Sequence, residues 1–134
     1  MSNINVETKG PKGPQIKESL LPTAVNGYKR GLGVTYGADA FHATLAGTAG
    51  EAVVGFIEED AVSTENPISV VLFGQTVGQI GAAVAANAFL AVNASGQLVT
   101  AVAGNHVVAR ALEAGSTAGD YIAILVLDGA VILA

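Results

Sequence analysis

Short apolar stretches separated by turn residues run along most of the chain. The clearest are Ala52 to Ile57, Ile68 to Phe73, Val107 to Leu112 and Tyr121 to Leu127. They are rich in Val and Ile, which favour strands, and turn residues recur about every 8 to 12 positions. The last stretch is apolar throughout, which is typical of a strand covered on both faces. The pattern predicts an all-β fold, a compact sandwich or barrel-like domain.

The same order of strand, turn and strand occurs twice, at an offset of 54 residues. Gly50 matches Gly104, and Glu59 matches Glu113. The apolar positions also match in order: Val53 and Val54 with Val107 and Val108, and Ile68, Val70, Val71 and Leu72 with Ile122, Ile124, Leu125 and Val126. We therefore expect two related strand-turn-strand halves.

A hairpin is predicted before each copy. The two hairpins are Leu32 to Tyr36 with Phe41 to Leu45, around GADA, and Phe89 to Val92 with Gln97 to Ala101, around NASG. Asn and Gly tolerate the positive φ angles that tight hairpin turns require. Between the copies, the Ala-rich stretch from Ala82 to Ala88 allows one short helical turn.

Composition adds a small-sided core to this picture. The 134 residues, enough for one domain, are 51% apolar and 13% charged, with 24 Ala, 17 Val and 17 Gly. Small side chains suit thin, closely packed β layers. Cys is absent, so neither disulfides nor thiolate chemistry contribute.

Charge divides the chain into an arm and a body. Residues 1–30 hold five basic and two acidic residues, a net charge of +3, whereas residues 31–134 carry a net charge of −8. The segment GPKGP, Gly10 to Pro14, cannot lie inside a helix, because proline lacks a donor and restricts its predecessor. We expect residues 1–30 to form an extended N-terminal arm, either a solvated tail or a segment that orders on a partner.

Groups suited to chemistry are few. His42 and His106 lack a second ligand at metal spacing, and the acidic run Glu58 to Asp60 reads as solvated charge. No phosphate-binding loop or nucleophile elbow occurs. We expect a protein that is not an enzyme, with no catalytic residue, metal or cofactor.

Nucleic acid and membranes are also unexpected partners. The basic residues are not interleaved with aromatic residues, and the acidic body would repel phosphate. The weakly polar run from Gly81 to Ala94 is too short to span a bilayer. The N-terminus lacks the basic-then-apolar order of a secretory signal.

From Arg30 to Leu127 the chain resembles the small capsid decoration (cement) proteins of tailed bacteriophages. The resemblance rests on four segments in order: RGLGV, VVGFIEEDAVSTENPISVVLFG, AAVAANAFLAVNASGQLVTA and VVARALEAGSTAGDYIAILVL. Some members of this group carry a predicted-recombinase label, against which the missing phosphate loop argues.

The resemblance implies a structural virion protein. It would be made in the host cytoplasm, bind the major capsid protein on the outer surface of the expanded head as a homotrimer, and stabilise the head against the pressure of packaged DNA. Alternatives are another β-rich virion or surface module, such as a tail component or adhesin, and a nucleic-acid-binding recombination factor.

Two sets of residues are candidate contacts. The arm would bind the capsid through Lys9, Pro11, Lys12, Pro14, Ile16, Lys17, Leu20 and Leu21. The apolar chain end, which is unusual because chain ends are commonly polar and frayed, would make a subunit contact through Val131, Ile132 and Leu133.

Overall fold

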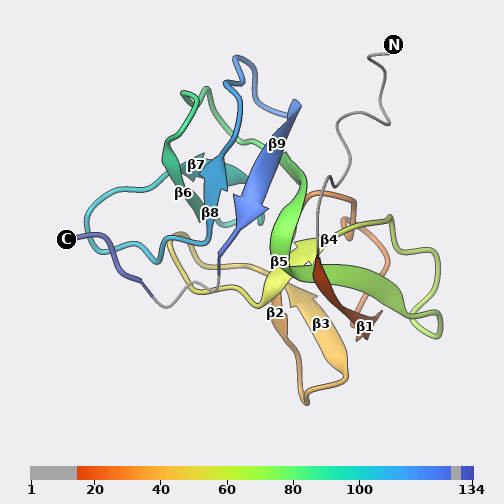
Figure 1. Cartoon of the computed structure of the whole chain (residues 1–134). Coiled ribbons are helices and arrows are strands. Elements are labelled where there is room, and N and C mark those ends of the chain that lie inside the picture. The colour runs from red at the N-terminus through yellow and green to blue at the C-terminus, as the bar shows by residue number, and fades with distance from the viewer. Residues whose placement is uncertain (1–14, 128–130) are drawn as a thin grey trace, which may run out of the picture.

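The computed structural model describes residues 15–127 and 131–134, and these contain nine β-strands and no helix (Figure 1). The strands are β1 (Ile16–Pro22), β2 (Gly33–Tyr36), β3 (His42–Leu45), β4 (Gly55–Ile57), β5 (Ile68–Gln79), β6 (Phe89–Val92), β7 (Leu98–Thr100), β8 (Ala109–Ala111) and β9 (Tyr121–Val126). The predicted all-β class is confirmed. The helical turn allowed between Ala82 and Ala88 is absent, and Val84 instead makes an isolated bridge to Gly115.

The strands form one mixed sheet in the order β1-β3-β2-β4-β5-β9-β8-β6-β7, with an additional pairing of β1 with β5. That pairing closes the five strands β1, β3, β2, β4 and β5 into a ring. Beyond it, the later part of β5 pairs with β9, and a parallel bridge from Ile80 to Leu98 brings β7 back to β5. We call these the N-terminal ring (residues 15–73) and the C-terminal ring (residues 74–127). Figure 1 shows β5 passing from one to the other.

The two rings have the same strand pairings, so the predicted internal repeat is confirmed and extends to whole rings. The amide of Ile57 donates to the Leu32 carbonyl at 3.0 Å, and the amide of Ala111 donates to the Ala88 carbonyl at 2.9 Å. Gly50 and Gly104 both have positive φ, 79° and 92°. Residues of β4, β5, β8 and β9 correspond at an offset of 54, those of β2 and β6 at an offset of 56, and those of β3 and β7 at an offset of 55.

The largest core cluster joins the two rings. Phe56 and Val71 of the N-terminal ring are fully buried together with Leu90, Val92 and Ile124 of the C-terminal ring. Gly33 allows the close approach, because a Cβ atom there would lie only 3.0 Å from Cγ1 of Val92. The Gly33 amide also donates to the Gly96 carbonyl at 2.9 Å. These contacts hold the β6–β7 hairpin against the N-terminal ring.

The later part of the segment predicted as an extended arm is a strand of the sheet. Residues 16–22 form β1, which pairs antiparallel with β5 and parallel with β3. Leu20 is 1% exposed and belongs to the N-terminal core. A strand between β3 and β5 satisfies backbone groups that would otherwise form open edges, and this gain outweighs the low apolar content of the whole segment. Lys9, Pro11, Lys12 and Pro14 lie outside the described residues.

β9 also differs from the expectation of a strand covered on both faces. Ile122, Ile124 and Val126 are buried, whereas Tyr121 is 43% exposed and Leu125 is half-buried. An apolar outer face therefore remains on the C-terminal ring, although the sequence of the strand is apolar throughout.

Candidate functional site

The titratable side chains that could take part in chemistry make local hydrogen bonds and ion pairs that hold the fold. Nδ1 of His42 lies 2.7 Å from Oδ1 of Asp39, which also accepts a hydrogen bond from the Phe41 amide at 2.9 Å. The bond to His42, followed by that from the Phe41 amide, lowers the pKa of Asp39 below its ordinary value. The carboxylate thereby braces the turn of the β2–β3 hairpin.

The acidic run from Glu58 to Asp60 has separate partners. Glu58 forms an ion pair with Lys17 at 3.0 Å, while Asp60 lies 3.9 Å from Lys29 and accepts a hydrogen bond from the Arg30 amide. Within the described part of the chain, no three His, Cys, Asp or Glu side chains gather as metal ligands would.

The arm residues predicted to bind a capsid occupy different environments. Leu20 is in the core and is unavailable to a partner, so that prediction is wrong, and Leu21 is half-buried. Ile16 is 59% exposed and pairs with Phe73, itself 48% exposed. This pair forms an apolar patch at the start of β1, and Lys17 is the next residue along the strand.

The predicted subunit-contact residues form a docked tail. The amides of Gly104 and Val107 donate to the carbonyls of Leu133 and Val131, each at 2.8 Å. Ile132 bridges to His106. Side chains of the tail are nevertheless open to solvent, since Val131 is 65% and Ile132 is 55% exposed. The tail is thus fixed by its backbone and presents apolar side chains outward.

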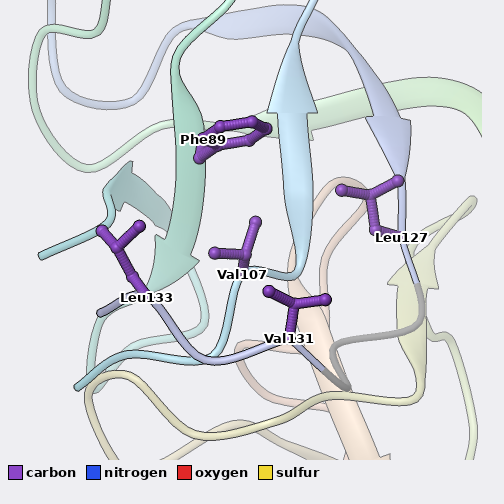
Figure 2. A pocket seen from close by; sticks show the side chains of 5 residues that line it. All are labelled: Phe89, Val107, Leu127, Val131 and Leu133. Atoms are coloured by element: carbon purple, nitrogen blue, oxygen red, sulfur yellow. The ribbon is translucent and has the colours of Figure 1, made fainter. Parts of the chain in front are cut away.

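Beside the tail lies an open apolar pocket of about 250 Å³. It is lined by Phe89, Val107, Leu127, Val131 and Leu133. Figure 2 shows these five side chains converging from β6, from the segment before β8, from the end of β9 and from the tail. Arg110 lies at its edge, with its guanidinium carbon 5.9 Å from the centre of the Phe89 ring.

A second prominent apolar feature is Phe41, which is 72% exposed at the end of the β2–β3 hairpin. Its backbone is fixed on both sides, by the Asp39 carboxylate and by the Leu21 amide, which donates to the Phe41 carbonyl at 2.8 Å. Tyr36 on the same hairpin donates to Glu18 at 2.9 Å, and this carboxylate raises the pKa of Tyr36.

Sequence reasoning missed Phe41, Phe89 and Arg110 as surface features. A signal was present for two of them in the internal repeat, because aromatic Phe89 corresponds to Gly33, and cationic Arg110 corresponds to Phe56. Such exchanges between repeated positions indicate a change of environment. The pocket itself is built from four separate segments and has no local signature.

No helix among the described residues has the length and apolar character needed to cross a bilayer. No protein-family model matches the chain, and no curated protein matches it.

Proposed function

We propose that the protein is a capsid decoration protein of a tailed bacteriophage. It binds the major capsid protein on the outer surface of the expanded head as a homotrimer, after synthesis in the host cytoplasm, and holds neighbouring capsid subunits together against DNA pressure. It acts by binding alone, without catalysis or a cofactor. The resemblance of residues 30–127 to this class is the starting point for the proposal.

The observation that carries the proposal is a pair of separate apolar surfaces on a closely tied β body. One is the exposed pair Ile16 and Phe73, and the other is the pocket beside the tail. Contiguous exposed apolar surface commonly marks a site of protein association. A cement protein needs at least two such surfaces, one for the shell and one for its own copies.

The capsid contact is assigned to the Ile16 side. Lys9, Pro11, Lys12 and Pro14 precede this patch in the chain, and Lys17, which is paired with Glu58, follows Ile16. Basic residues there would be attracted to an acidic shell surface, with a strength that falls as salt rises. Burial of Ile16 and Phe73 would add a contribution to the binding free energy that does not depend on salt. It amounts to about 1.5–3 kcal/mol for each side chain fully buried.

Sedimentation with undecorated expanded capsids tests the proposal. Full-length protein should pellet with the particles and raise the temperature at which they break. Deletion of residues 1–14, which leaves β1 intact, should weaken binding most at low salt. Phe73→Ser should weaken it at every salt concentration, whereas Val62→Ser, a change at a site that is 74% exposed, should not. Protein that stays in the supernatant at all salt concentrations would refute the proposed function.

A further inference from the structure

One face of the N-terminal ring is covered by the C-terminal ring within the same chain. Gly33, Val53 and Phe56 lie together on this face, and Val92 packs onto them with its Cγ1 atom 3.0 Å from the position of a Gly33 Cβ. The β6–β7 hairpin supplies this cover, because Val92 ends β6 and the Gly96 carbonyl accepts from the Gly33 amide.

The corresponding face of the C-terminal ring has no such cover. The repeat relates Gly33, Val53 and Phe56 to Phe89, Val107 and Arg110, respectively. Phe89 and Val107 line the open pocket, and Arg110 is exposed at its edge. The outer side chains of β9, among them half-buried Leu125, continue this apolar face, whereas the corresponding Val71 is fully buried between the rings.

The tail only partly replaces the missing hairpin. The Gly50 amide donates to the Val92 carbonyl at 2.8 Å, and the corresponding Gly104 amide donates to the Leu133 carbonyl at 2.8 Å. The tail therefore satisfies the same backbone donor that the β6–β7 hairpin satisfies in the N-terminal ring. It leaves a hollow of about 250 Å³ with only apolar side chains around it.

The chain carries a second hairpin of the same kind, and its end is free. The β2–β3 hairpin corresponds to β6–β7 and projects away from the rest of the body (Figure 1). Its Phe41 is 72% exposed, whereas the corresponding Gly96 lies against the N-terminal ring, where its carbonyl accepts a hydrogen bond from the Gly33 amide. An aromatic side chain on a backbone braced by Asp39 loses little conformational freedom on binding.

Size and charge match between this hairpin and the pocket. Apolar cavities of about 150 Å³ accept a benzene ring, so the pocket beside the tail has room for a phenylalanine side chain. Asp39, which is 49% exposed, is two residues from Phe41, and Arg110 stands at the edge of the pocket. No ion pair occupies Arg110 among the described residues, and an incoming carboxylate would supply one.

We propose that the occupant of the pocket is Phe41 of a second copy of this chain, with Asp39 of that copy facing Arg110. The contact repeats between chains the packing of hairpin on ring that already joins the two rings within one chain. It uses different surfaces on the two partners, and such a heterologous contact closes into a ring when the rotation between copies allows. The inference rests on the proposed homotrimer and assigns its subunit contact.

Cysteine cross-linking tests this contact, because the natural chain contains no cysteine. Ala40→Cys marks the hairpin next to Phe41, and Ile132→Cys marks the tail without altering the pocket lining. A mixture of the two single variants should form disulfide-linked dimers, and the double variant should form covalent trimers. Adding Phe41→Ser to the Ala40→Cys variant should reduce the cross-link at least about tenfold, since one phenylalanine loses its burial. Val62→Cys replaces Ala40→Cys as the control for random collision.

The reaction is run on free protein up to about millimolar concentration and on any particle-bound protein. No cross-link above the Val62→Cys control in either setting overturns the inference, even if the protein binds shells as proposed. Cross-linking through Ile132→Cys alone would also overturn it, because that result indicates a tail-to-tail contact. A cross-link in solution without shell binding would support this contact while refuting the proposed function.

Discussion

The N-terminal and C-terminal rings share one topology but differ in what covers an equivalent face. In the N-terminal ring, Phe56 is fully buried beneath the β6–β7 hairpin. At the matching position of the C-terminal ring, Arg110 is exposed beside an open pocket. The internal repeat produces the same face on both rings. Within one chain, the β6–β7 hairpin covers this face on the N-terminal ring, and no hairpin covers it on the C-terminal ring. The uncovered face is therefore the natural place for contact between copies.

Substitutions at these two matching positions should differ most in their effect on the free energy of unfolding. Phe56→Ala removes a fully buried side chain between the rings and should lower the free energy of unfolding by about 3–5 kcal/mol. Arg110→Ala changes an exposed side chain and should alter it by less than about 0.5 kcal/mol. Urea denaturation of both variants measures the difference. Similar losses for both would show that the rings are covered alike.

Removal of Val131 to Ala134 should have the next largest effect. Three backbone hydrogen bonds between described residues hold the tail: Gly104 to Leu133, Val107 to Val131 and Leu133 to Asn105. At about 0.5–1.5 kcal/mol each, their loss should lower the free energy of unfolding by roughly 1.5–4.5 kcal/mol. The truncated chain should also lose self-association, because the pocket loses two of its five lining residues.

The matched control for the tail is Ile132→Ser, which leaves the pocket lining in place and changes a side chain that is 55% exposed. Denaturant unfolding and sedimentation equilibrium should show this variant close to the wild type. A truncated chain with unchanged stability and association would contradict the role given to the tail.

The local parts of the fold could be predicted from the sequence. The hairpin around Asn93 to Gly96, the apolar stretch that forms β9 and the internal repeat all depend on neighbouring residues or on comparison along the chain. β1 could not be predicted in this way. Its pairing partner β5 lies about 50 residues away, and the Pro- and Lys-rich segment before it dominates the local composition.

The candidate site could be predicted only in part. The apolar chain end pointed to Val131, Ile132 and Leu133, and the structure fixes their backbone against residues 104–107. Phe41 was missed because a single aromatic residue next to a turn has the same local pattern whether it is buried or exposed. Its exposure follows from the projecting hairpin, which is a property of the whole ring.

A smaller effect is expected at the matching positions Gly31 and Asn87, which both have positive φ, 87° and 70°. Gly31→Ala should lower the free energy of unfolding by at least about 1–2 kcal/mol, since its Cβ would also lie 2.8 Å from the Gln79 amide nitrogen. Asn87→Gly keeps the backbone conformation, so it should change the free energy of unfolding by less than about 0.5 kcal/mol. Thermal unfolding of the two variants tests this, and equal losses would contradict it.

The smallest effect concerns the brace of the β2–β3 hairpin. The pKa of Asp39 in the folded protein is lowered below 3.8 by His42 and the Phe41 amide. A lowered folded-state pKa favours the folded hairpin above the unfolded pKa, and this contribution is lost as pH falls through the folded-state pKa. NMR titration should show the Phe41 amide responding with the midpoint of Asp39, and His42→Ala should raise that midpoint toward 3.8. An unchanged midpoint in His42→Ala would contradict the brace.

The most direct test of the central claim is an electron cryomicroscopy map of expanded phage heads mixed with the purified protein. Three copies should lie around each local threefold position on the outer surface. Ile16 and Phe73 should face the shell, and the β2–β3 hairpin of each copy should lie in the pocket of the next. Heads that remain bare under saturating protein would contradict the claim that this chain is a capsid decoration protein.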